Sequence, residues 1–314
     1  MWCGSTLPAL NPLHPRPNMP FAPALFSRAT LCATLALALL PSAFVARSAE
    51  PAPETRRNRE VIWNNIPAQP HPLVSHHALD SQAMARAVGY TLYLPPGYAA
   101  EDARRYPVIY FLHGMGGDEN ADGPGFAGIV DRLVKAGAVP PVICVFPNGG
   151  RSGYRDNPED KVMVETMIIR ELIPFIDSAY RTRADRDSRL IAGYSMGAAG
   201  SARLALVYPE LFSATAGWGF SFTGRNPDGP FAPEFSPEAL KRTDDRVRIL
   251  MIIGHDDPYR PGFAGALKVL NDAKYPFTYR TLENVGHNLG LYYRLTGEQV
   301  VRFLMEGVAP PSES

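Results

Sequence analysis

The chain has 314 residues, with 31 Lys and Arg against 31 Asp and Glu, so its formal charge is zero. A chain of this length buries roughly three quarters of its unfolded surface, which is enough for one large core. The charges are interspersed, and this excludes the basic surface expected of a nucleic-acid partner or of binding to an anionic membrane. The partner is expected to be small or neutral.

The first 48 residues have the composition of a secretory leader. They contain no Asp or Glu, and Arg28 precedes an apolar run over residues 31–40. That run is too short to cross a bilayer as a helix. We therefore predict a secreted or periplasmic protein, cleaved near Ser48 and not inserted in a membrane afterwards. The alternatives are a mobile tail on a cytosolic protein and a true start at Met19.

The three cysteines are divided between the leader and the body of the chain. Cys3 and Cys32 lie in the predicted leader, and Cys144 is the one that remains after cleavage. The mature protein therefore has no internal disulfide. Cys144 lies in the apolar run VICVFP, where no polar neighbour lowers its pKa, so we expect a buried hydrophobic side chain.

Regular patterning begins after a polar, proline-rich stretch. Residues 49–70 are interpreted as a linker or a strapped extension, and residues 71–307 as one catalytic domain without internal repeats. Residues 308–314 are expected to be a disordered tail. The stretch HPLVSHH (71–77) has three histidines but no accompanying carboxylate or cysteine, so we do not expect a metal site there.

Apolar runs alternate with helical patterns along this domain. The expected strands cover residues 90–98, 107–114, 141–150, 189–195, 214–220, 247–254 and 277–286. The expected helices cover residues 126–136, 163–178, 196–208, 262–273 and 297–306, with a kink or reset at Pro174. Short continuous apolar strands are buried on both faces, and their alternation with helices predicts an α/β fold with a mostly parallel sheet.

One serine stands at the carboxyl end of a predicted strand. Ser195 follows the strand RLIAG and precedes a helical pattern, and Gly193 and Gly197 lie two residues to either side. A serine on so abrupt a strand-to-helix turn has an unfavourable backbone conformation that exposes its hydroxyl, and glycines are needed where side chains would clash. Ser195 is therefore the candidate nucleophile.

A serine nucleophile needs a base and an acid that orients the base. In this topology both follow the serine in the chain, the acid first. Two histidines follow Ser195, and His287, after the final strand, is the expected base, whereas His255 lies where the acid belongs. The acid is Asp256 or Asp257, and the turn after the strand favours Asp257.

The tetrahedral intermediate of acyl transfer needs two backbone N–H donors. The residue after the nucleophile, Met196, supplies one. The other is expected in the glycine-rich loop FLHGMGGDEN after an earlier strand, with Met115 as candidate. His113 either pins that loop or is an ordinary core side chain, and the sequence leaves both open.

These motifs in this order resemble the putative esterase family of α/β hydrolases, which includes feruloyl esterases, the esterase D type and antigen 85-type mycolyltransferases. The similarity runs through YLPPGY, LHGMGG and GYSMG to GHN, and is closest to secreted feruloyl-esterase-like members. By position, the resemblance makes Ser195 the nucleophile, Asp257 the acid and His287 the base, with Met115 and Met196 as oxyanion donors.

The expected activity is that of a serine esterase on carbohydrate-linked acyl, feruloyl or similar esters, without a cofactor. The interval of about 25 residues between 222 and 247 is too short for a large lid, so we expect an open cleft. The alternatives are an acyltransferase that uses the same residues and an inactive binding module on the same fold. The sequence does not indicate the oligomeric state.

Overall fold

The computed structural model describes residues 60–309 apart from 101–102, 223–234, 242 and 244–245. Contacts divide the chain into Met1–Arg56 and Arg57–Ser314, and the fold below is that of the second unit. The predicted leader, most of the tail and part of the interval expected to lack a lid lie outside the described residues.

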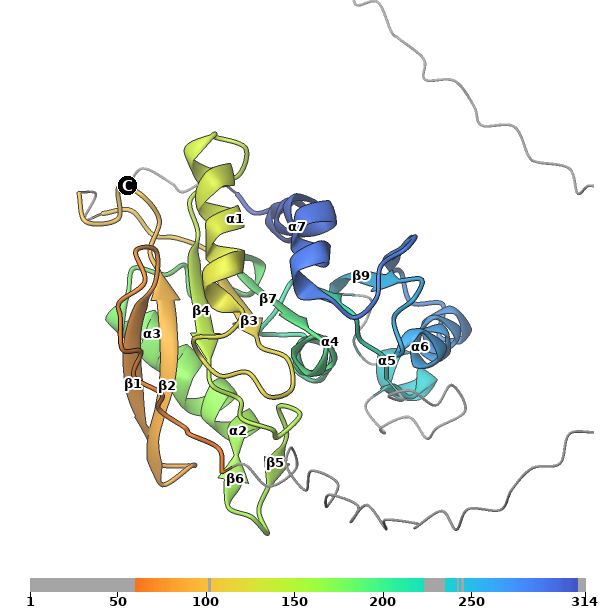
Figure 1. Cartoon of the computed structure of the whole chain (residues 1–314), viewed down its shortest axis with the longest axis horizontal. Helices are drawn as coiled ribbons and strands as arrows, with labels where there is room; N and C mark the ends of the chain where they lie inside the picture. The colour runs from red at the N-terminus through yellow and green to blue at the C-terminus, as the bar shows by residue number, and fades with distance from the viewer. Residues whose placement is uncertain (1–59, 101–102, 223–234, 242, 244–245, 310–314) are drawn as a thin grey trace, which may run out of the picture. The chain divides into compact units, whose positions relative to one another are not determined.

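An eight-stranded sheet forms the centre of this unit (Figure 1). Its strands, in spatial order, are β1 (Ser75–Ser81), β2 (Arg86–Tyr93), β4 (Ile143–Pro147), β3 (Val108–Leu112), β7 (Arg189–Tyr194), β8 (Ala214–Trp218), β9 (Arg248–Gly254) and β10 (Thr278–Leu282). β2 pairs antiparallel with both β1 and β4, and every other neighbouring pair is parallel. The predicted fold class is confirmed, and each of the seven expected strands is present.

The sequence pattern missed the edge strand β1. Of its seven residues only Leu79 and Ser81 are buried, because an edge strand in an antiparallel pair contacts water along most of its length. Its polar composition therefore resembles that of a loop. A second missed element is a two-stranded hairpin of β5 (Asp156–Asn157) and β6 (Val162–Met163).

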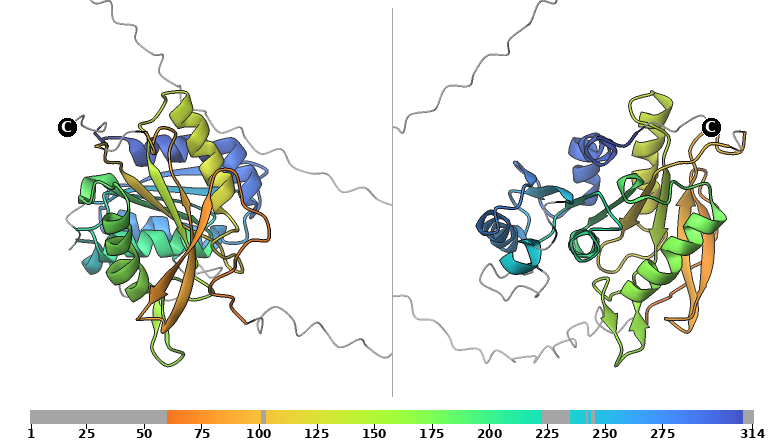
Figure 2. Two further views of the ribbon diagram at one scale, coloured as in Figure 1. Left: turned by 90° about the vertical axis from the view of Figure 1, so that its left-hand side faces the viewer. Right: turned by 180° about the vertical axis from the view of Figure 1, so that it is seen from behind.

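Helices cover both faces of the sheet, as the views in Figure 2 show. On one face lie α1 (Gly123–Lys135) and α7 (Leu289–Met305). On the other lie α2 (Val164–Thr166), the π-helical segment η1 (Met167–Leu172), α3 (Ile173–Ala179), α4 (Met196–Val207) and α6 (Arg260–Asp272). Two shorter elements are η2 (Arg186–Ser188) and α5 (Pro237–Lys241).

The central strand β3 shows why its sequence is apolar throughout. Val108, Tyr110 and Leu112 belong to the core on the α4 face, whereas Ile109 and Phe111 belong to the core on the α1 face. Successive side chains of a strand point to opposite faces, so burial on both sides removes the polar alternation.

The helix expected over 163–178 is interrupted before Pro174. Proline has no N–H and cannot donate to the carbonyl four residues earlier. Before the proline, the chain forms the π-helical segment η1, in which the Ile173 N–H donates to the carbonyl of Ile168, five residues earlier. α3 then begins with Pro174 in its first turn. The N–H groups of a first turn have no partner within the helix, so a proline there costs no hydrogen bond.

The last helix begins eight residues earlier than the predicted start at 297. Asn288 caps it, since its side chain accepts the Leu291 N–H. Gly297 lies inside the helix, where a Cβ would meet Ile129 of α1 at 2.5 Å, so the two helices pack closely at this position. α7 therefore begins two residues after His287 and ties that loop to the core.

Residues 60–66, here called the strap, lie against the sheet although they precede the predicted domain start. The Trp63 carbonyl accepts the Gly89 N–H at 2.6 Å, and the Ile62 carbonyl accepts Asn148 Nδ2 at 2.9 Å. The second part of the polar, proline-rich stretch is thus hydrogen-bonded to β2 and to the loop after β4.

Candidate active site

Ser195 occupies a strained turn between β7 and α4. Its φ of 53° and ψ of −115° are unfavourable for a residue with a side chain. A Cβ on Gly193 would lie 2.4 Å from the Gly197 backbone, and a Cβ on Gly197 would lie 1.9 Å from the Leu112 carbonyl oxygen. The turn therefore requires both glycines, and it presents the serine hydroxyl at the carboxyl end of β7.

The structure brings Ser195, His287 and Asp257 together from the loops that follow β7, β10 and β9. Ser195 Oγ lies 2.9 Å from His287 Nε2, and His287 Nδ1 lies 2.8 Å from Asp257 Oδ2. An ionised carboxylate can only accept, so the proton of the neutral imidazole resides on Nδ1 and Nε2 accepts from the hydroxyl. This arrangement can take a proton from the serine as its oxygen attacks a carbonyl.

Asp257 is a buried carboxylate that accepts three hydrogen bonds. It is 3% exposed, and it accepts the Tyr292 hydroxyl at 2.6 Å and the Tyr259 N–H at 2.9 Å in addition to His287. Burial by itself raises the pKa of this carboxyl, but the bonds from His287, Tyr292 and Tyr259 outweigh it and hold the pKa below its usual value. The group is therefore ionised at neutral pH.

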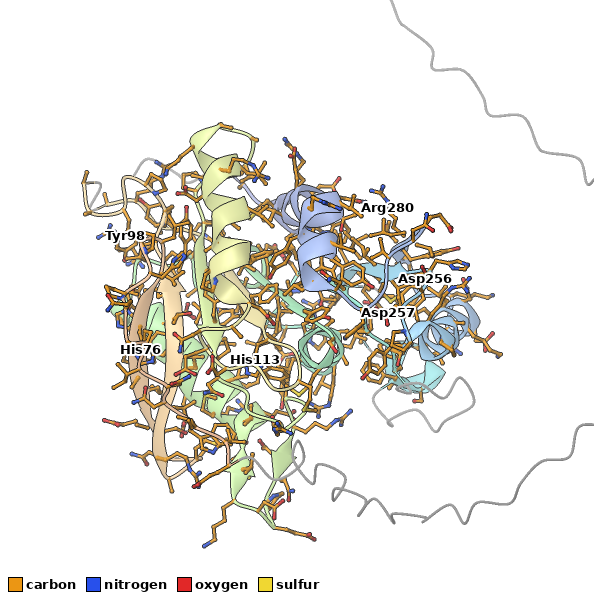
Figure 3. The ribbon with its side chains drawn as sticks, in the orientation of Figure 1. His76, Tyr98, His113, Asp256, Asp257 and Arg280 are labelled. Atoms are coloured by element: carbon orange, nitrogen blue, oxygen red, sulfur yellow. The ribbon has the colours of Figure 1, made fainter. Side chains whose placement is uncertain are left out.

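The neighbouring carboxylate lies in a different environment. The Asp256 side chain is 60% exposed and pairs with His255 Nδ1 at 3.1 Å. Of the two acids that the sequence left open, only Asp257 contacts His287. In Figure 3, Asp257 and His113 lie to either side of α4.

Three tyrosines around His287 and Asp257 were not singled out from the sequence. The Tyr194 ring stacks on the imidazole with centroids 4.8 Å apart, and its hydroxyl donates to the His287 carbonyl. The Tyr259 ring lies at 4.8 Å on a tilted plane. The third is Tyr292, the donor to Asp257. Aromatic faces favour a cationic imidazolium. Tyr194 adjoins the serine and could have been noticed, whereas no spacing marks the other two.

A cavity of about 260 Å³ adjoins the serine. It is lined by Met115, Ser195, Met196, Ala199, Gly219, Phe220, Ser221 and Tyr259. Both predicted oxyanion donors therefore border the same space as the hydroxyl. Gly219 has a φ of +63°, and a Cβ there would lie 2.9 Å from the His287 ring. The lining is mostly apolar, which suits an acyl group.

His113 ties the loop that carries Met115 to the loop after β4. It is buried, its Nε2 accepts the Gly149 N–H at 2.9 Å, and its Nδ1 therefore carries the proton that it donates to the Gly114 carbonyl at 2.8 Å. Burial lowers its pKa, against opposing effects of the Gly114 bond and nearby carboxylates. Of the two interpretations left open, the structure supports a pin for this loop.

The remaining cysteine and two histidines considered from the sequence lie outside this cluster. Cys144 is fully buried on β4, and burial raises its pKa. His77 bonds the Ser75 hydroxyl at 2.7 Å, and His71 accepts the Leu73 N–H.

In the described part of the chain, no group of three or more His, Cys, Asp or Glu is placed to hold a metal ion. Within the same residues, no helix is long and apolar enough to span a bilayer.

The comparison with protein families decides the identity of the fold. Residues 81–293 match the family model described as "Putative esterase". The chain belongs to this esterase family. The resemblance noted from the sequence is thereby confirmed.

Curated relatives share parts of the esterase domain. An esterase of Mycobacterium tuberculosis is 34% identical over 149 residues, which are 46% of this chain and 32% of that protein. An endo-1,4-beta-xylanase/feruloyl esterase of Xylanibacter ruminicola is 28% identical over 235 residues, 72% of this chain and 30% of that protein. The chain thus spans about a third of the length of these relatives.

Solved structures share the fold of this chain. A ferulic acid esterase superposes with a TM-score of 0.66 at 24% identity, covering 74% of this chain and 97% of the other. An S-formylglutathione hydrolase of Staphylococcus aureus gives a TM-score of 0.60 at 16% identity, covering 74% and 98%. Identities this low bear on the fold alone.

Proposed function

We propose that the esterase hydrolyses carboxylic esters through an acyl-enzyme, with Ser195 as nucleophile, His287 as general base and Asp257 as the acid that orients it. The observation that carries this proposal is the unbroken pair of contacts, 2.9 Å from Ser195 to His287 and 2.8 Å from His287 to Asp257. A serine, an imidazole and a buried carboxylate in this order form the arrangement that activates a hydroxyl for acyl transfer.

In the first half of the reaction, Ser195 Oγ bonds the ester carbonyl carbon while His287 Nε2 takes the hydroxyl proton. The carbonyl oxygen becomes an oxyanion, for which we assign the backbone N–H groups of Met196 and Met115 as donors. Collapse of this intermediate breaks the bond to the alcohol, which leaves with the proton from His287. In the second half, water attacks the acyl-enzyme with the same base and donors, and releases the acid.

We further propose carbohydrate-linked acyl or feruloyl esters as the substrate class, and a secreted or periplasmic location for the mature esterase. The support is the apolar lining of the cavity beside Ser195 and the similarity to an endo-1,4-beta-xylanase/feruloyl esterase and to a ferulic acid esterase. An apolar pocket accommodates an acyl chain or ring and leaves the sugar outside.

The test is a panel of esters, from acetyl through feruloyl to long-chain acyl groups, assayed with the full-length wild type and with Ser195→Ala. Loss of the nucleophile is expected to reduce kcat/KM by more than about a thousandfold. A fluorophosphonate should label the wild type at Ser195 and leave the variant unlabelled.

A loss of less than about a hundredfold in the alanine variant would contradict nucleophilic catalysis, and absence of both turnover and label would favour a binding module. Adding sugar acceptors and comparing acyl-sugar with free acid separates hydrolysis from transfer. Predominant acyl-sugar would replace the hydrolase assignment with an acyltransferase.

A further inference from the structure

Glu119 is a buried carboxylate in the loop that carries Met115, outside the cluster described above. It is 1% exposed, and its oxygens meet donors from three other parts of the chain. Oε1 accepts the Asn65 N–H at 2.6 Å and lies 3.1 Å from His76 Nε2 on β1. Oε2 accepts Asn148 Nδ2 at 2.6 Å from the loop after β4. A buried carboxylate held in this way is stable only while those donors stay in place.

The Glu119 carboxylate packs closely against β2. A Cβ on Gly89 of β2 would lie 1.9 Å from Glu119 Oε1, so the carboxylate rests directly on the β2 backbone. The Glu119 carbonyl also accepts the Thr91 hydroxyl at 2.7 Å. Glu119 is thereby fixed from both its side chain and its main chain.

One residue of the strap bonds three consecutive residues of the same loop. The Asn65 N–H bonds Glu119, its Nδ2 donates to Asp118 Oδ2 at 2.5 Å, and its carbonyl accepts Asn120 Nδ2 at 2.6 Å. These bonds hold the strap and the loop as one unit, although they are more than fifty residues apart in sequence.

Only a short turn separates this anchor from Met115. The Gly117 N–H bonds the Gly114 carbonyl at 3.0 Å, and the Gly114 N–H bonds Asp122 Oδ2 at 2.9 Å. Gly116, with a φ of +85°, completes the turn. The position of the Met115 N–H is therefore set by what anchors the loop on either side: His113 before it, and Glu119 and Asp122 after it.

We propose that Glu119 is a positioning residue for the oxyanion loop, and that the strap is its required partner. The proposal rests on the proposed function, because it assigns a purpose to the anchor only if Met115 donates to the oxyanion. Glu119 does not touch the substrate. It acts through the loop, and it makes residues 60–66 part of the working enzyme rather than a linker.

The decisive variant is Glu119→Gln in the full-length protein. The amide nitrogen of glutamine donates and cannot accept, so it opposes the Asn148 amide or the Asn65 N–H and breaks at least one anchor. A displacement of about 1 Å in a catalytic group reduces turnover about a hundredfold. We expect kcat to fall about ten- to hundredfold, while KM stays within about threefold because the acyl cavity is unchanged.

The matched control is Glu171→Gln, which makes the same chemical change in another anchoring carboxylate. Glu171 accepts the Ser81 hydroxyl and the Ala83 N–H at the β1–β2 turn. Its loss is expected to lower the melting temperature and leave kcat per active site unchanged. Asn65→Ala removes only the bond to Asp118 and tests the strap. Asn148→Ala removes the side-chain donor to Glu119 Oε2 and decides the question if Glu119→Gln does not fold.

Rates are expressed per active site, and the active sites are counted by complete fluorophosphonate labelling. Unfolded protein is not labelled and therefore does not lower the measured kcat. The inhibition constant of phenylboronic acid, whose tetrahedral serine adduct mimics the oxyanion, should rise by the factor by which kcat/KM falls, in Glu119→Gln and not in Glu171→Gln. Amide hydrogen exchange in residues 114–118 should accelerate in the same variant only.

A kcat within twofold of wild type in the folded variant, or a lower kcat with unchanged boronate inhibition, would overturn the positioning role. Failure of the proposed function is separate: Ser195→Ala would then retain activity. The hydrogen-exchange comparison reports on the anchor independently of turnover, so unchanged exchange in Glu119→Gln would overturn the anchor even if no ester were hydrolysed.

Discussion

The structures on the two sides of Ser195, here called the histidine wall and the oxyanion wall, are built in different ways. The histidine wall consists of side chains from the last third of the chain, in which Asp257 accepts hydrogen bonds from both His287 and Tyr292. The oxyanion wall is a loop whose proposed contribution is a backbone N–H, and its supports come from distant segments, the strap and the loop after β4.

This difference explains why the residues of the histidine wall could be predicted from the sequence and the anchors of the oxyanion wall could not. Proton transfer needs an imidazole and a carboxylate, so residue type itself marks the histidine wall. A backbone N–H is available from any residue except proline, so residue type says nothing about which one is used. What matters on the oxyanion wall is the anchoring of the loop, and the anchors are ordinary polar residues such as Asn65 and Glu119.

The largest expected effect tests the histidine wall. Asp257→Asn removes the charge that stabilises the imidazolium and fixes its tautomer, so kcat should fall about a thousand- to ten-thousandfold. Asp256→Asn is the matched control, because that side chain contacts His255 and is mostly exposed. Its kcat should stay within about twofold of wild type, as measured by steady-state kinetics on an acetyl ester. Equal losses in the two variants would refute the assignment of Asp257.

The next effect tests the junction of the two walls. A Cβ on Gly197 would meet the Leu112 carbonyl at 1.9 Å and the His113 carbonyl at 2.7 Å, so Gly197→Ala pushes the elbow away from the oxyanion loop. We expect kcat/KM to fall about a hundredfold or more and the unfolding free energy to fall by about 2–4 kcal/mol.

Gly128→Ala provides the control for that substitution. Gly128 lies in α1 with nothing within 4 Å of its would-be Cβ, so alanine there should raise the unfolding free energy by about 0.5–1 kcal/mol and leave kcat/KM unchanged. Urea denaturation and steady-state kinetics measure both. An elbow variant that behaved like Gly128→Ala would mean that the two walls are not in close contact.

The smallest effect concerns the oxyanion wall and its pH dependence. Burial lowers the pKa of His113 in the folded state, whereas in the unfolded chain it is about 6.5. Below about pH 6.5 the unfolded state therefore binds a proton that the folded state does not, and stability is lost as the pH falls, by up to about 1.4 kcal/mol per pH unit. Above that pH the contribution is constant.

His113→Asn removes this titration. Its unfolding free energy should depend less steeply on pH between 7 and 5 than that of the wild type, although it starts lower because the bond to Gly149 is weakened. His71→Asn, at an exposed histidine, should keep the wild-type slope. Parallel curves for wild type and His113→Asn, from urea titrations at several pH values, would count against a neutral buried imidazole.

Much of the fold could be predicted because its signals are local. Apolar runs identified seven strands, and Gly193 and Gly197 around Ser195 identified the elbow, since each pattern lies within a few residues. The elements that were missed lack such a local signal. β1 has an exposed, polar edge, and the start of α7 depends on the Asn288 cap and on the fit of Gly297 against Ile129.

The sequence by itself determined the α/β class and the elbow with Ser195, and it predicted His287 as the base and two neighbouring candidates for the acid. Only the tertiary structure decided that Asp257 contacts His287, that three tyrosines surround the pair, and that the strap anchors the oxyanion loop. The physical reason is range: the contact between Ser195 and His287 joins residues 92 positions apart, and that between Asn65 and Glu119 residues 54 apart. Hydrogen bonds over such separations depend on how the sheet and its loops pack, which no local pattern records.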